Sequence, residues 1–154
     1  MNAQLSIAGK MAKEEQYTIP VLVGGEVTNM SLKIVRGAKK KGMVEIMFET
    51  AKAGKIAACI EAKEKGVSGY VAVENQDTKA LLSSHMQDIT KGFGEETGDL
   101  QVTQVSNLNF ARFSNNLAQP GPYDGPETET YEVQTARLYK IATSFIEHVK
   151  ELEY

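Results

Sequence analysis

The feature that most constrains the fold is a near-regular alternation of apolar and polar residues from Met43 to Val73, broken by two short turns that contain glycine. Successive side chains of a β-strand point to opposite faces of a sheet, so a period of two predicts half-buried strands. The expected strands cover Met43 to Thr50, Lys55 to Lys63 and Val67 to Val73. The turns between them are short enough to join antiparallel neighbours, which predicts a meander.

One face of this meander is apolar in every strand, and the other face carries charge. The apolar face is formed by Val44, Ile46, Phe48, Ile56, Ala58, Ile60, Ala62, Val71 and Val73. A slip of one residue would exchange the two faces, so the phase of each strand predicts which residues are buried. We expect Phe48 and Ile60 to be buried, and the carboxylates Glu45, Glu49 and Glu61 to lie on a solvated face.

A hairpin is predicted before the meander, from Tyr17 to Val35. Its first strand contains Pro20, which has no N–H to donate to a sheet and therefore favours an edge position. Gly24-Gly25 is a strong turn signal between two such strands. In the second strand, from Val27 to Val35, residues Met30, Leu32 and Ile34 share one face.

After the meander the apolar spacing changes from two residues to three and four. Leu82, Met86, Ile89 and Phe93 follow this spacing, which predicts an amphipathic helix from Asn75 to Phe93 that covers the sheet. Asn75 or Asp77 is the expected N-cap, because a short side-chain acceptor can satisfy free N–H groups of the first turn. A last strand is predicted at Gly98 to Ser106.

A second amphipathic helix is predicted at the C-terminus, beyond a linker that contains three of the four prolines. Its apolar stripe consists of Leu138, Ile141, Ala142, Phe145, Ile146, Val149 and Leu152. A helix of this length is marginal in water unless its apolar face is covered. It packs either on the chain's own core or on a partner, and we favour the first because the linker is long enough to reverse direction.

The chain has 154 residues, 42% of them hydrophobic, which suits one domain with a real core. The predicted fold class is α+β: a mainly antiparallel meander of about five or six strands covered by one helix, with the C-terminal helix added. The expected parts are an N-terminal segment with weak helical character at 1–16, an α+β core at 17–110, the linker at 111–126 and the C-terminal helix at 127–154.

No residue pattern points to catalysis, a cofactor or a metal. His85 and His148 fall on different predicted helices without a second ligand at metal-binding spacing. Cys59 lies in an apolar strand with no basic neighbour to activate it, which is typical of a buried structural thiol. We therefore expect a chain that is not an enzyme and has no catalytic, cofactor-binding or metal-binding residues.

Arg36 and Lys39 to Lys41 form one basic cluster, in a loop predicted between Arg36 and Gly42. This loop is the basis for an alternative function, a small nucleic-acid-associated domain. The net charge of -3 and the lack of interleaved aromatic residues disfavour that alternative. No apolar run approaches the roughly 20 residues that a membrane-spanning helix needs, so we expect a cytoplasmic chain without membrane insertion.

From about Leu32 to Asn107 the sequence resembles the C-terminal domain of the flagellar hook-length control protein family. The resemblance lies in the order of five motifs along the chain: the glycine-led strand Gly42-x-Val44-x-Ile46-x-Phe48, the strand Ile56 to Ala62, the strand ending in Val71-Ala72-Val73-Glu74-Asn75, the helix carrying Leu81, Leu82, Met86 and Ile89, and Gly98-Asp99-Leu100-Gln101-Val102. The family's Leu-x-Pro-Glu-x-Leu-Gly lead is absent, and the resemblance covers roughly half of the chain.

The resemblance implies a regulatory role rather than a chemical one. Domains of this family bind the cytoplasmic part of the flagellar type III export gate and help to switch export from hook to filament substrates. A protein partner of that kind, and a possible route of export through the same apparatus, are therefore expectations for this chain. The contact residues and the oligomeric state stay open.

Overall fold

The computed structural model describes residues 14–36, 41–95, 98–111, 128–152 and 154, with side chains of the last helix described from Thr135 onward. The strands are β1 (Glu14–Val23), β2 (Glu26–Arg36), β3 (Gly42–Thr50), β4 (Gly54–Ala62), β5 (Val67–Val73) and β6 (Gly98–Gln104). The helices are α2 (Gln76–Gly92) and α4 (Thr128–Lys150). The expected N-terminal segment up to residue 13 and the linker from 112 lie outside the described residues.

The described strands form one six-stranded sheet in the order β1-β2-β3-β4-β5-β6. β1 to β5 pair antiparallel, whereas β6 pairs parallel with β5. The parallel pair follows from the connection, because α2 carries the chain back to the end of the sheet where β5 began. The predicted α+β class and the meander are confirmed, and the sheet is mixed at its β6 edge.

The β1–β2 hairpin begins earlier than the sequence pattern suggested. Glu14 already pairs with Val35, so the first residues of the core belong to the strand and the expected boundary at residue 17 is wrong by three residues. The turn residues Gly24 and Gly25 have φ values of 57° and 87°, the left-handed conformations of a type I′ turn. β1 is an edge strand, as Pro20 predicts.

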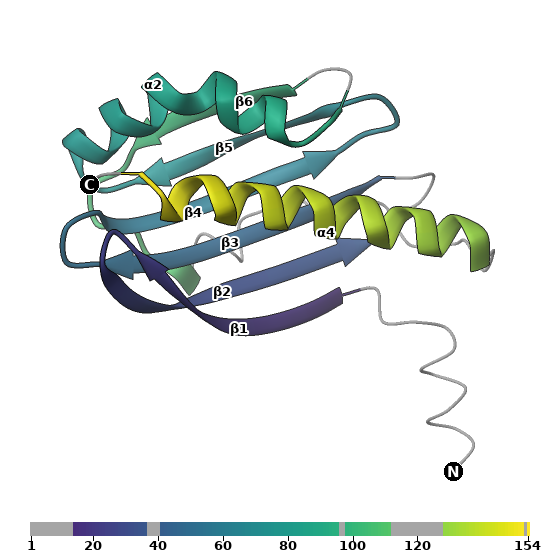
Figure 1. Cartoon of the computed structure of the whole chain (residues 1–154), viewed down its shortest axis with the longest axis horizontal. Coiled ribbons are helices and arrows are strands. Elements are labelled where there is room, and N and C mark those ends of the chain that lie inside the picture. Colours follow the sequence, from purple (N-terminus) through teal and green to yellow (C-terminus); the bar gives the residue numbers. More distant parts are fainter. Residues whose placement is uncertain (1–13, 37–40, 96–97, 112–127, 153) are drawn as a thin grey trace, which may run out of the picture.

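Both helices lie on the same face of the sheet (Figure 1). α4 packs across β1, β2 and β3, and α2 covers β5 and β6 while also contacting α4. The apolar face of the meander forms the core beneath them, and Phe48 and Ile60 are buried as predicted. Covering this face therefore takes two helices, where the pattern around α2 alone suggested one.

α4 folds back onto its own sheet. Leu138, Ile141, Phe145 and Val149 are fully buried in the same core cluster as the strands, so the intramolecular packing favoured from the sequence is confirmed. Glycines let the helix come close: a Cβ on Gly42 would lie 2.8 Å from Leu138 Cδ1. This close approach leaves little room for any side chain at that position.

The α2 N-terminus is capped as the sequence predicts. Asn75 has an extended backbone, and its Oδ1 accepts hydrogen bonds from the N–H groups of Asp77 and Thr78 at 2.7 and 3.3 Å. Thr78 Oγ1 in turn donates to the Ala53 carbonyl at 2.8 Å. These bonds anchor the first turn of α2 to the β3–β4 turn, which sets the position of the helix over its half of the sheet.

Candidate interaction surface

Arg36 is not a solvated loop residue, and this part of the predicted basic cluster is wrong. It is the last residue of β2, with its side chain on the α4 side of the sheet and no solvent exposure. The guanidinium forms an ion pair with Glu15 at 2.5 Å, and its Nε donates to Thr135 Oγ1 at 3.0 Å. Lys39 and Lys40 lie outside the described residues, and Lys41 is exposed.

Glu15 is the centre of a polar cluster between β1 and α4. Its carboxylate accepts hydrogen bonds from the hydroxyls of Tyr17 and Tyr139 in addition to the ion pair with Arg36. Burial by itself would raise the pKa of Glu15, but these hydrogen bonds and the charge of Arg36 outweigh it and hold the pKa below its ordinary value. Burial and the bond to Glu15 raise the pKa of Tyr139. The cluster ties the edge strand to the helix.

The face of the sheet opposite the helices carries Cys59, which is buried as predicted. Glu45 lies directly across from it in the β3–β4 register and is only 1% exposed, so its expected place on a solvated face is wrong. Glu49 and Glu61 on the same face are exposed, as expected. Burial, then the negative charges of Glu45 and Glu61, raise the pKa of the Cys59 thiol to about 12. A thiol with this pKa is a poor nucleophile.

Each histidine ring contacts a backbone carbonyl of its own helix. His85 Nδ1 lies 3.0 Å from the Leu81 carbonyl, and His148 Nδ1 lies 2.8 Å from the Ser144 carbonyl. His148 also fills the space above Gly92, where α2 and α4 meet. Among the residues that the structure describes, no three His, Cys, Asp or Glu side chains are grouped to hold a metal ion. Neither described helix is long and apolar enough to cross a bilayer.

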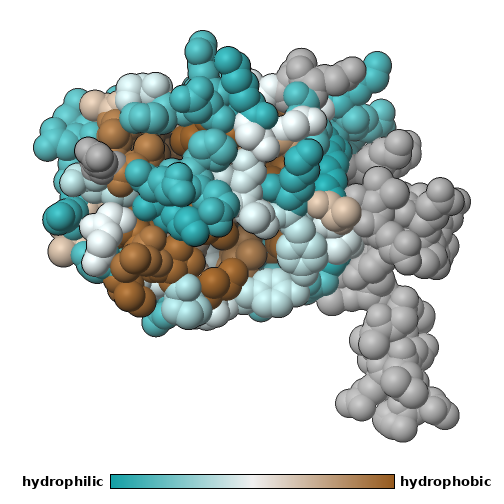
Figure 2. All heavy atoms as spheres, in the orientation of Figure 1, coloured by the Kyte–Doolittle hydropathy of each residue, from teal (hydrophilic) through white to brown (hydrophobic). Residues whose placement is uncertain are grey.

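An apolar surface that the sequence reading missed lies at the tip of the β1–β2 hairpin. Leu22 and Val27 pair across the hairpin and are 58% and 69% exposed, the two largest values among the exposed large hydrophobic residues described. Figure 2 shows apolar surface gathered over this hairpin, beside α4. The available signal was Val21-Leu22-Val23, where apolar residues occupy both faces of a strand instead of alternating.

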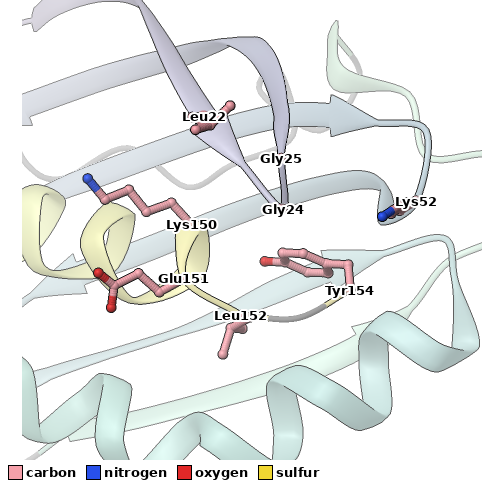
Figure 3. A pocket seen from close by; sticks show the side chains of 8 residues that line it. All are labelled: Leu22, Gly24, Gly25, Lys52, Lys150, Glu151, Leu152 and Tyr154. Atoms are coloured by element: carbon pink, nitrogen blue, oxygen red, sulfur yellow. The ribbon is translucent and has the colours of Figure 1, made fainter.

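A hollow of about 370 Å³ lies between the hairpin tip and the end of α4 (Figure 3). It is lined by Leu22, Gly24, Gly25, Lys52, Lys150, Glu151, Leu152 and Tyr154. The Tyr154 hydroxyl donates to the Val149 carbonyl at 2.7 Å, which holds the ring against the turn. The hollow thus combines an apolar wall, a glycine turn and a charged rim, a composition suited to contact with another protein segment.

Comparison with known proteins identifies no relative of this chain. No family model matches the chain, and neither a curated protein nor a solved structure is significantly similar to it.

Proposed function

We propose that this chain is a non-enzymatic protein–protein interaction domain of the hook-length control type. In this role it binds the cytoplasmic part of the flagellar type III export gate and switches export from hook to filament substrates. The observation that carries the proposal is the element order β3-β4-β5-α2-β6, from Gly42 to Gln104. It is the same order, over the same residues, as the motifs on which the resemblance rests.

The sheet also supports a binding role through the surface that it leaves open. α2 and α4 occupy one face (Figure 1). Leu22 and Val27 of the β1–β2 hairpin are exposed, and Leu22 lines the hollow. Exposed apolar residues that adjoin a hollow are typical of protein interaction sites. The chain therefore has both a rigid core and a surface against which a partner can bury apolar side chains.

The test is direct binding to the immobilised cytoplasmic domain of the export gate encoded in the same genome. We expect saturable binding with a Kd on the order of 1 μM, because regulatory contacts of modest area fall at the weak end of the affinity range. The measurement is biolayer interferometry. A control chain carrying Leu138→Asp and Phe145→Asp, which places two charges in the core and is expected to unfold, should not bind.

Nucleic-acid binding is the outcome that would contradict the proposal. A chain that ignores the gate domain but binds labelled DNA or RNA, with an affinity that falls steeply between roughly 50 and 200 mM salt, would be a nucleic-acid-associated domain instead. Because Arg36 is buried in its ion pair, binding at this loop would depend on Lys39, Lys40 and Lys41. Substitution of these three lysines by alanine separates the two functions.

A further inference from the structure

We propose that the hollow between the β1–β2 turn and the end of α4 is a docking site for a protein segment with an apolar side chain next to a carboxylate. The inference deepens the proposed function, and it rests on that function only for the identity of the partner. The site, its ligand chemistry and its test follow from the residues around the hollow.

The apolar side of the site is Leu22, which lines the hollow, and its cross-strand partner Val27, which extends the apolar patch beyond the lining. They lie opposite each other in the register, so they form one patch at the tip rather than two isolated residues. Val23, their neighbour, is buried in the core and fixes the position of the turn. An exposed apolar patch on a rigid hairpin favours binding of a partner, because burying it requires little reordering of the hairpin backbone.

The main chain at Leu22 adds a second contact. Val23 and Glu26 flank the two-residue turn and form a hydrogen-bonded pair. Hydrogen-bonded and non-hydrogen-bonded pairs alternate along an antiparallel ladder, so the next pair, Leu22 and Val27, is a non-hydrogen-bonded pair. The N–H and C=O groups of Leu22 therefore point away from β2, toward the free edge of the sheet. An extended segment lying along this edge can pair with them, which is a common mode of peptide recognition.

The floor of the hollow needs glycine. Gly24 has φ +57°, and a Cβ built there would lie 3.3 Å from the Tyr154 ring. With Gly25 also lacking a side chain, the turn leaves a flat seat bounded by Leu152 and Tyr154. The volume of about 370 Å³ lies at the lower end for ligand pockets and accommodates one or two apolar side chains of a peptide.

The charge at the rim selects a carboxylate. Lys150 forms an ion pair with Glu147 at 3.1 Å, whereas Lys52 is exposed and makes no ion pair with any residue that the structure describes. A carboxylate next to the buried apolar side chain can pair with Lys52. Glu151, on the opposite wall, disfavours a polyanion such as a nucleic-acid backbone, because a run of phosphates would meet a like charge.

The test uses the whole chain, labelled with ¹⁵N, and two acetylated and amidated pentapeptides. One is Gly-Leu-Asp-Leu-Gly, and the other has asparagine in place of the aspartate. We expect the acidic peptide to shift the backbone amides of Leu22, Gly24, Gly25 and Val27, with a Kd on the order of 1 mM, because a short flexible peptide binds weakly. The asparagine peptide should bind about threefold more weakly, as loss of an exposed ion pair implies.

Matched variants assign the contacts. Leu22→Ser is expected to weaken the acidic peptide about tenfold, and Lys52→Ala about threefold. The controls are Val105→Ser, at an exposed valine directly after β6 at the far edge of the sheet, and Lys63→Ala, at an exposed lysine outside the hollow. Both should leave the affinity unchanged. All of these side chains are exposed, so the variants keep the fold.

Several outcomes would overturn the inference. Amide shifts confined to other parts of the chain, or equal affinity for the two peptides, would remove the site or its carboxylate preference. Self-association in sedimentation velocity that Leu22→Ser abolishes would make a second copy of the chain the occupant. Gate binding that persists in Leu22→Ser would leave the proposed function intact while removing this site from it. Peptide binding at the hollow without gate binding would support this site and contradict the proposed function.

Discussion

The guanidinium of Arg36 has no contact with solvent, and the structure places it between the carboxylate of Glu15 and the hydroxyl of Thr135. A buried cation is costly unless it is paired, so the pair holds only while β1, β2 and α4 all stay in place. In the linear sequence Arg36 stands next to a basic tract and carries every sign of an exposed loop residue. Its burial is the clearest case in this chain of a local pattern overruled by packing.

Arg36→Met is expected to lower the free energy of unfolding by about 3 kcal/mol at pH 7, because it leaves a partly buried carboxylate without its cation. The lower end of the usual range applies, since the Glu15 side chain keeps 22% of its exposure and its bonds to two tyrosines. Urea unfolding measures the change. Lys33→Met, at a half-buried surface pair, is the control and should cost much less.

The same cluster predicts how stability depends on pH. The pKa of Glu15 is lower in the folded chain than its ordinary value, so its contribution is complete above the ordinary pKa and is lost as the pH falls through the folded one. The difference in unfolding free energy between the wild type and Glu15→Gln should therefore shrink on acidification below about pH 4. A difference that grows toward acid would contradict the assigned hydrogen bonds.

Cys59 is expected to resist alkylation in the folded chain. Burial and the charges of Glu45 and Glu61 raise its pKa to about 12, so almost no thiolate exists at pH 8. Iodoacetamide should modify it only when the chain unfolds, and the labelled fraction followed by mass spectrometry should track the denaturant transition. Rapid labelling at pH 8 without denaturant would show that the thiol is accessible.

At the level of elements, β1 is stabilised from one side by β2 and from above by α4. Pro20 lies opposite Asn29, a pair whose N–H groups point away from each other in this register, so the missing donor breaks no ladder bond. The proline instead removes a donor from the open edge of the sheet. This limits uncontrolled pairing along the middle of β1, whereas the N–H of Leu22 near the tip still points outward and can pair.

α4 contributes to stability in proportion to its buried stripe. Phe145→Ala should destabilise the fold by about 3 to 5 kcal/mol, because the ring is fully buried against the sheet. The thermal midpoint should fall by the same amount at every protein concentration, since the contact lies within one chain. Thr143→Ala, on the exposed side of the helix, is the matched control. A midpoint loss that depends on concentration would mean that the helix packs between chains.

In the whole molecule, the two helices divide one face of the sheet between them, and α2 also closes the parallel β5–β6 pair. The contact between the helices is close because Gly92 lies under His148, where a Cβ would come within 2.5 Å of His148 Cε1. The resulting core runs without interruption from Val23 in the hairpin to Leu152 after α4. This continuity makes the hairpin tip and the end of α4 neighbours, and so builds the hollow.

The sequence by itself determined the strands of the meander, their buried faces, the capped helix at Asn75 and the apolar stripe of the last helix. These features follow from periodicity and local side-chain chemistry, which are properties of a few consecutive residues. Only the tertiary structure decided that β6 runs parallel, that Arg36 and Glu45 are buried, and that Leu22 and Tyr154 flank one hollow. Each of these features depends on which distant segment of the chain packs against a residue. The pattern of a few consecutive residues does not contain that information.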